Sequence, residues 1–197
     1  MHGLLPIRGE SLRPILKMPD YPELHTARLH LRLLEERDLP LLAAMHADPR
    51  VMEFLFKTLD RAESDAVAQR DREHFERHGF GRWGVEVIAT GQFVGLVGLK
   101  VPNFEAHFTP CVEVGWRLAH EHWGHGYATE AAQAALDFAF GPLGLAEVVS
   151  FTTSKNLPSR RLMERLGMTR SPADDFDHPN LPADSSLRRH VLYRRSR

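Results

Sequence analysis

The stretch from Cys111 to Gly167 constrains the fold more than any other part of this sequence. In residues 112–118, every second position carries a β-branched, aromatic or aliphatic side chain, which predicts a strand. The glycines at positions 124 and 126 predict a break after it. A helix comes next and ends at Gly141-Pro142. Its register is carried by apolar residues at three- and four-residue spacing, namely Ala128, Ala131, Ala132, Ala135, Leu136 and Ala139.

The glycine loop between this strand and this helix is a candidate anion site. The first amides of a helix lack intrahelical partners, and the helix N-terminus carries a partial positive charge. Gly124 and Gly126 have no Cβ to hold a ligand away, so a phosphate fits at residues 123–129, with His122 or His125 at the rim. The loop contains no lysine or arginine, which separates it from a Walker loop. A glycine-rich turn that binds nothing explains the same residues equally well.

The remaining patterns predict a mixed, largely antiparallel sheet with helices on both faces. Helices are predicted at residues 38–47, 59–77 and 158–166, and a loop at 171–186. Further strands are predicted at residues 29–34, 80–88, 92–101, 148–152 and 190–193. Gly95 and Gly98 indicate a bulge or the close approach of another backbone. Residues 1–22 carry four prolines and predict an extended or disordered arm before a single domain at residues 23–197.

Two motifs resemble those of the GNAT N-acetyltransferases. Gly126-Tyr127-Ala128-Thr129-Glu130 is similar to the family's acyl-CoA pyrophosphate loop, whose pattern is Gln/Arg-x-x-Gly-x-Gly/Ala. Trp123 stands in the Gln/Arg position, a departure shared with the RimJ/RimL-type branch, the acetyltransferases of ribosomal-protein N-termini and their relatives. Residues 156–168 resemble the family's second segment, Asn-x-x-Ala/Ser-x-x-Leu-Tyr-Glu-Lys-x-Gly-Phe. The resemblance runs from about residue 24 to 193 and implies the GNAT fold, an α/β (α+β) fold with a six- to seven-stranded sheet splayed in the middle.

The resemblance implies acetyl-CoA as cosubstrate, bound in the gap between the strands at 112–118 and 148–152. Asn156 would contact the pantetheine arm, although such a residue is also a common helix N-cap. Gly115 suggests a bulge with a free N–H that polarises the thioester carbonyl, while packing also explains a strand glycine. The residues implied to bind the cosubstrate, by main chain or side chain, are Val114, Trp116, Trp123, Gly124, His125, Gly126, Tyr127, Ala128, Thr129, Asn156 and Ser159.

Acetyl transfer to an amine needs a base for the ammonium and a donor for the departing thiolate. By resemblance, Ser159 is the donor, because the family's tyrosine position holds Met163 here. A serine in the first turn of a helix is also often a local cap. Glu113 resembles the branch's glutamate that acts as a base through water, and a surface carboxylate is the alternative reading; Glu86 is a weaker substitute. Cys111 has no required role, since the thioester is already activated.

The acceptor is an amine, either a peptide N-terminus or a small molecule, and the sequence does not distinguish these. Trp83, Phe104 and Phe108 could line the acceptor cleft, and core packing explains them equally well. A GNAT-like module that binds acyl-CoA for sensing or scaffolding, without turnover, is the alternative function. A homodimer is compatible with the resemblance.

Composition excludes several other classes of protein. The net charge of −1 argues against nucleic-acid binding, and the single cysteine excludes an intrachain disulfide. No metal is expected, because Gly124 stands where a zinc-protease motif starting at His120 needs its second histidine. We expect no membrane span and no signal peptide, and therefore a cytoplasmic location.

Overall fold

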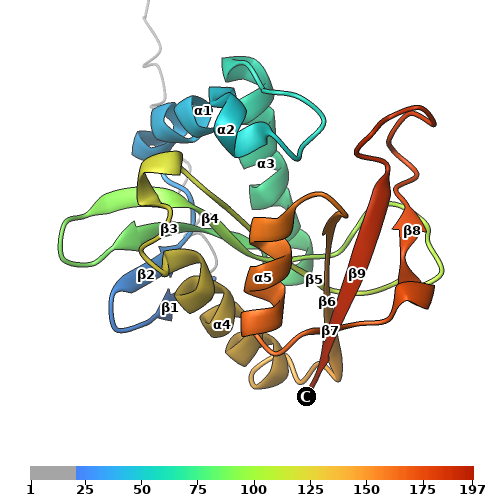
Figure 1. Cartoon of the computed structure of the whole chain (residues 1–197). Helices are drawn as coiled ribbons and strands as arrows, with labels where there is room; N and C mark the ends of the chain where they lie inside the picture. The colour runs from blue at the N-terminus through green and yellow to red at the C-terminus, as the bar shows by residue number, and fades with distance from the viewer. Residues whose placement is uncertain (1–20) are drawn as a thin grey trace, which may run out of the picture.

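The computed structural model describes residues 21–197, so the expected N-terminal arm lies outside the described residues except for its last two positions. One sheet runs through the fold in the order β1-β2-β3-β4-β5-β6-β9-β7, with β8 beside β9 (Figure 1). Six strands have four residues or more: β2 Leu29–Arg32, β3 Arg82–Val87, β4 Gln92–Lys100, β5 Glu113–Leu118, β6 Glu147–Thr153 and β9 Arg189–Ser196. Three two-residue strands extend the sheet: β1 Leu24–His25, β7 Thr169–Arg170 and β8 Phe176–Asp177. Among the paired strands of residues 21–197, only β5 and β6 are parallel, which confirms the predicted mixed, mostly antiparallel sheet.

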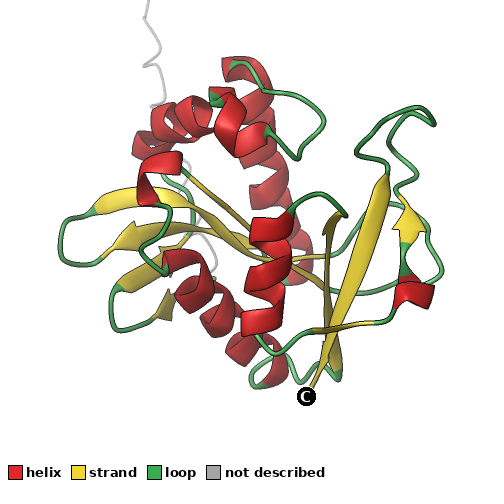
Figure 2. Ribbon diagram, viewed as in Figure 1, coloured by secondary structure: helices red, strands yellow, loops and turns green. Residues whose placement is uncertain are grey.

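Helices cover both faces of this sheet (Figure 2). In Figure 1, α4 and α5 lie in front of the sheet, and α1 to α3 lie above and behind it. The α-helices are α1 Leu39–Ala47, α2 Pro49–Met52, α3 Arg61–His78, α4 Tyr127–Phe140 and α5 Leu157–Arg165. The short 3-10 turns are η1 Glu36–Asp38, η2 His120–His122 and η3 Pro172–Asp174. The predicted loop at 171–186 therefore contains η3 and β8. Within residues 21–197, no helix has both the length and the apolar character to cross a membrane.

Local sequence signals set the ends of α3. The Asp60 carboxylate accepts from the Glu63 N–H, and the Glu63 carboxylate accepts from the Asp60 N–H, which forms a capping box. Gly79 then takes the left-handed conformation at φ 75° and ends the helix. The helix predicted at 59–77 is therefore confirmed with ends shifted by one or two residues.

The alanines of α4 let this helix lie close on the sheet. Ala131, Ala132, Ala135 and Ala139 are all fully buried in the main core cluster. Small side chains allow a short distance between the helix axis and the strands beneath it, and α4 packs on β2, β4 and β5. The position of the N-terminus of α4 is thus fixed by the core.

The sheet splays between β5 and β6. These parallel strands share one register pair, Glu113 opposite Val149, supported by the bond from the Val149 N–H to the Val112 carbonyl at 2.9 Å. By contrast, β5 pairs with β4 over six residues and β6 with β9 over seven. The splay expected from the resemblance is therefore confirmed, and it opens a gap in the middle of the sheet.

The bulge lies in a different place from the one predicted for β5. The β4–β5 register runs unbroken past Gly115, so a bulge at that residue is wrong. The register instead shifts between β3 and β4, next to Val85 and Glu86. At the neighbouring Gly95 (φ 146°), a Cβ would lie 2.3 Å from the Arg117 carbonyl oxygen, so this glycine also permits a close backbone approach. In β5, unpaired main-chain groups arise because β6 diverges, and no extra residue is needed.

Candidate functional site

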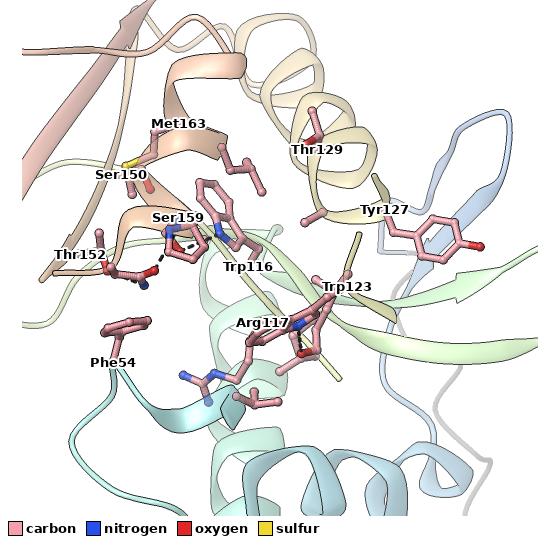
Figure 3. Close-up of a pocket in the computed structure, with 18 of the residues that line it drawn as sticks. Phe54, Trp116, Arg117, Trp123, Tyr127, Thr129, Ser150, Thr152, Ser159 and Met163 are labelled. Carbon is pink, nitrogen blue, oxygen red and sulfur yellow. Dashed lines mark hydrogen bonds between the residues drawn. The ribbon is translucent and has the colours of Figure 1, made fainter. Parts of the chain in front are cut away.

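A cavity of about 940 Å³ opens where β5 and β6 diverge. Its walls come from the glycine loop and first turn of α4, from β5, β6 and α5, and from the segment that follows α2 (Figure 3). This volume is at the upper end of the range for small-molecule sites. The gap in the sheet is thus a pocket that both strands and helices line.

The entrance beside α4 is a cradle of main-chain donors. Within the described chain, the N–H groups from Gly124 to Thr129 have no hydrogen-bond acceptor, and the first bond of α4 runs from the Glu130 N–H to the Gly126 carbonyl at 3.1 Å. Gly124 and Gly126 both have left-handed backbones, at φ 80° and 81°. A Cβ at Gly124 would meet no atom within 4 Å, so the space above the loop is open. This arrangement suits a phosphate or diphosphate group.

Arg28 binds the main chain of the glycine loop and forms an ion pair with Glu130. Its guanidinium donates to the His125 carbonyl at 3.0 Å and to the Glu130 carboxylate at 2.6 Å, and it lies 4.9 Å from the centre of the Tyr127 ring. Burial would raise the pKa of Glu130, but hydrogen bonds from Thr26 and Arg28 outweigh it and lower that pKa. Arg28 was not predicted from the sequence, because it lies about a hundred residues before the loop and no motif links its turn to the loop. It fastens the first turn of α4 to the β1–β2 turn.

The aromatic and histidine residues of the loop are divided between the cavity and solvent. Trp123 is 46% exposed, and its indole N–H donates to the Leu118 carbonyl at 2.9 Å, which fastens the loop to the end of β5. His122 lines the cavity. The His125 side chain does not line it and stacks on Tyr127 instead, with ring centres 5.4 Å apart. The structure therefore leaves His125 its main-chain N–H as the group that faces an anion.

Main-chain groups of β5 face the gap. The Ala119 N–H donates to a β4 carbonyl, whereas the Val112 carbonyl accepts from Val149 in β6. Because main-chain groups alternate between the two neighbouring strands, those of Val114 and Trp116 point towards β6. Beyond Val149, no strand of residues 21–197 pairs with β5 on this side. A ligand in the gap can therefore bind the main chain as an added strand does.

Trp116 and Ser159 come together on the α5 side of the gap (Figure 3). Asn156 lines the same side of the cavity. The Trp116 indole N–H donates to the Ser159 hydroxyl oxygen at 3.3 Å. The Asn156 side chain accepts from the Ser159 main-chain N–H at 3.2 Å and donates to the Thr152 hydroxyl at 3.0 Å. Asn156 is thus the N-cap of α5, and the Ser159 side chain is not the cap. Since the indole bonds to its oxygen, the Ser159 hydroxyl keeps its own hydrogen to donate elsewhere.

The Glu113 carboxylate lies on the face of β5 opposite to the one that carries Trp116. Its side chain reaches the cavity, but the surrounding protein removes most of its water, which raises its pKa to about 7. Nearby Lys100 and Arg82 favour the charged form and limit this rise. Lys100 lies directly across the β4–β5 ladder from Glu113, and burial lowers the pKa of its ammonium group. Glu113 can therefore gain or lose a proton near neutral pH.

Glu86 and Cys111 lie outside the cavity lining. The Glu86 carboxylate accepts from Arg32 at 2.8 Å and from Arg37 at 3.2 Å, so the substitute base is excluded by its position. Burial raises the pKa of the Cys111 thiol to about 11, and the thiol is protonated at neutral pH. Neither side chain can act on a ligand in the cavity.

The aromatic candidates for the acceptor cleft pack in the core. Trp83 is fully buried, and its indole N–H donates to the Pro22 carbonyl at 2.7 Å. Phe104 and Phe108 form a separate cluster with other aromatic rings near β8, including Phe176. None of the three lines the cavity, so core packing is the correct interpretation.

The histidines of the glycine loop form no metal-ligand cluster. Within residues 21–197, the one group of three closely spaced potential ligands is Glu23, His25 and His30 on the β1–β2 hairpin. His30 bonds to Glu23 at 2.7 Å, and none of these side chains lines the cavity. The cavity chemistry described above involves main-chain donors, one hydroxyl and one carboxylate.

Comparison with known proteins shows what the sequence and the fold are similar to. Residues 28–169 match the model of the acetyltransferase (GNAT) domain. The sequence is 35% identical over 155 residues to the FsC-acetyl coenzyme A-N(2)-transacetylase of Aspergillus fumigatus, which covers 75% of this chain and 65% of that protein. An acetyltransferase from Agrobacterium tumefaciens superposes with a TM-score of 0.72 at 29% identity, over 96% of this chain and 99% of that one. RimL, a ribosomal alpha-N-protein acetyltransferase solved in complex with coenzyme A, shares the fold (TM-score 0.71) at 14% identity, over 89% of this chain and 98% of that one.

Proposed function

The chain belongs to the GNAT acetyltransferase family, and from this premise we propose that it moves an acetyl group from acetyl-CoA directly to an amine while both substrates occupy the cavity. The observation that carries the proposal is the row of unpaired N–H groups at Gly124–Thr129, next to a gap whose edge holds Ser159. One end of this site suits a diphosphate, and the other suits a thioester. As acceptor we propose a peptide N-terminus or a small amine, as in the RimJ/RimL-type branch.

The residues of this chain fit acetyl-CoA in a definite order along the cavity. The amides of Gly124–Thr129 hold the diphosphate, and the main chain of Val114 and Trp116 binds the pantetheine arm as a strand would. Asn156 and Trp123 shape the two sides of the passage. Fixed main-chain dipoles need little reorganisation, which favours catalysis by preorganisation.

Two side chains account for the protons. Glu113, acting directly or through one water, takes the proton that the acceptor ammonium must lose before attack. Ser159 donates its hydroxyl hydrogen to the sulfur as the carbon–sulfur bond breaks, because Trp116 occupies the hydroxyl oxygen. The amine nitrogen forms the new bond to the acetyl carbon, and its remaining excess proton restores the Ser159 hydroxyl as the thiol leaves. No covalent enzyme intermediate is required.

The experiment that tests this function pairs calorimetry with a thiol-release assay on the full chain. We expect acetyl-CoA to bind with measurable heat and at least one acceptor, from a panel of peptides, amino acids and small amines, to release free CoA. Binding without release across the panel would support the alternative, a non-catalytic acyl-CoA-binding module. Absence of binding would remove both functions. A cytoplasmic location and a homodimer stay predictions.

A further inference from the structure

Arg117 is a cationic side chain in the cavity that has no partner among the residues the structure describes. It projects from β5 into the space beside Phe54, as Figure 3 shows. Within residues 21–197, its guanidinium makes no hydrogen bond and no ion pair. Burial is the main cause that lowers the pKa of Arg117, to about 9, and the positive charge of nearby Arg82 lowers it further. The negative charge of Asp71 opposes this shift. Arg117 is half-buried in the cavity wall, and no group of the described residues occupies its guanidinium donors, so they are available for a ligand.

The neighbouring charges do not compensate Arg117. Asp71 already holds Arg82 through both carboxylate oxygens, at 2.8 to 3.0 Å. Glu113 lies across the ladder from Lys100, so its carboxylate, when ionised, faces that ammonium group and not Arg117. This part of the cavity therefore keeps one uncompensated positive charge.

The floor of the cavity between Glu113, the proposed base, and the Arg117 guanidinium is open. Glu113, Gly115 and Arg117 follow one another on the same face of β5. A Cβ at Gly115 would meet only the Glu113 carboxylate, at 3.7 Å, so no side chain fills the space between the two charged residues. Four residues of strand separate their Cα atoms by about 13 Å. A bound acceptor can thus place its amine near Glu113 and a second group near Arg117.

We propose that Arg117 binds a carboxylate of the acceptor, so that the preferred substrate is an amine with a carboxylate several bonds from the reacting nitrogen, as in a peptide with an acidic residue close to its N-terminus. This inference rests on the proposed function of the same cavity. The guanidinium can form two parallel hydrogen bonds with a carboxylate, which sets the position of the acceptor as well as its affinity.

The test compares two acceptors that differ in one charge, the C-terminally amidated dipeptides alanyl-glutamate and alanyl-glutamine. For the wild type we expect kcat/KM to be about 10- to 100-fold higher for the glutamate peptide, mainly through a lower KM. Arg117→Met should lose this preference, while kcat and the Kd of acetyl-CoA stay within about twofold, and Arg117→Lys should keep part of it. Arg117 is half-buried and pairs with none of the described residues, so its replacement should not prevent folding. Arg77→Met, in the last turn of α3, is the matched control and should retain the full preference.

A binding measurement separates this inference from the proposed function. With CoA present, the acetylated, amidated alanyl-glutamate peptide should raise the melting temperature of the wild type and not of Arg117→Met. Equal kcat/KM for the two peptides in the wild type, or equal melting shifts in the two proteins, would overturn the role of Arg117. Failure of acetyl-CoA to bind, or absence of thiol release from any acceptor, would instead overturn the proposed function.

Discussion

At the scale of single residues, the proposed chemistry rests on Ser159 and Glu113, which lie on opposite sides of the gap. The position of the Ser159 hydroxyl is determined by α5 and by the indole of Trp116. The position of Glu113 is determined by β5, where it lies opposite Lys100 of β4. Sequence similarity pointed to both positions. The partner of the hydroxyl and the raised pKa of the carboxylate depend on contacts that the sequence does not display.

Ser159→Ala should lower kcat by about 10- to 100-fold, because the departing sulfur loses its proton donor. The Kd of acetyl-CoA should change less than about threefold, since the main-chain cradle is untouched. Calorimetry and steady-state kinetics measure the two effects separately. Ser171→Ala, at a position whose side chain caps nothing, should leave both values unchanged. A mutant with wild-type turnover would remove Ser159 from the mechanism.

Glu113→Gln should remove the acidic limb of the pH profile. With a pKa of about 7, the wild-type carboxylate is mostly protonated at pH 6 and mostly ionised at pH 8, so kcat/KM should rise across this range. The variant should be slower by about 10- to 100-fold at pH 8 and nearly independent of pH. The exposed Glu105→Gln should keep the wild-type profile. An unchanged limb in Glu113→Gln would assign the base to another group.

The same carboxylate makes the stability of the protein depend on pH. Its folded-state pKa lies above the ordinary value, so the folded state holds a proton that the unfolded state has lost between about pH 4.5 and 7. The contribution of this proton to stability is therefore full below pH 4.5 and is lost as the pH rises through 7. Glu113→Gln should raise the free energy of unfolding relative to wild type at pH 8 and little at pH 4.5. Denaturant titrations at the two pH values measure this difference, and an equal effect at both would contradict the raised pKa.

At the scale of elements, the junction between the glycine loop and α4 was the most predictable part of the chain. The period of the alanines and the two glycines are local signals, and they located the helix to within one residue. Elements of two residues, such as β1, β7 and β8, were missed because a period of two cannot be recognised over so short a run. The bulge predicted at Gly115 was wrong because a glycine alone does not distinguish a bulge from an open cavity floor.

Gly124→Ala should weaken acetyl-CoA binding about 10-fold or more, because the added methyl group enters the amide cradle. Gly144→Ala is the matched control, since both glycines have a positive φ and open space around the Cβ position. Both variants should lose about 1 kcal/mol of stability from the strained backbone. Only the first should lose affinity, as measured by calorimetry. A similar affinity in the two variants would place the diphosphate elsewhere.

At the scale of the whole molecule, the two halves of the sheet are joined weakly. One register pair links β5 to β6, although each strand is well paired on its other side. Arg28 adds a second long-range connection, from the β1–β2 turn to α4. A ligand that lies in the gap and bonds to its walls should therefore act as part of the sheet.

CoA at 100 times its Kd should stabilise the fold by about 2.7 kcal/mol. For a chain of this size, the melting temperature should rise by roughly 5 to 10 °C. Hydrogen exchange should slow at the amides of residues 124–129 and at Trp116, and should change little in the β3–β4 hairpin. Slower exchange confined to that hairpin would show that the ligand does not lie in the gap.

The sequence by itself determined the strand, the glycine loop, the alanine-lined helix and the family to which they belong, because these features depend on residues close together in the chain. The tertiary structure decided which charges meet. Arg28 reaches the glycine loop across about a hundred residues, and Glu86 is bound by Arg32. No carboxylate of residues 21–197 pairs with Arg117. Burial, pairing and pKa are properties of the environment that distant segments create together. The site that we propose for acetyl-CoA could therefore be predicted from the sequence, whereas the charge that we propose selects the acceptor became visible only in the folded cavity.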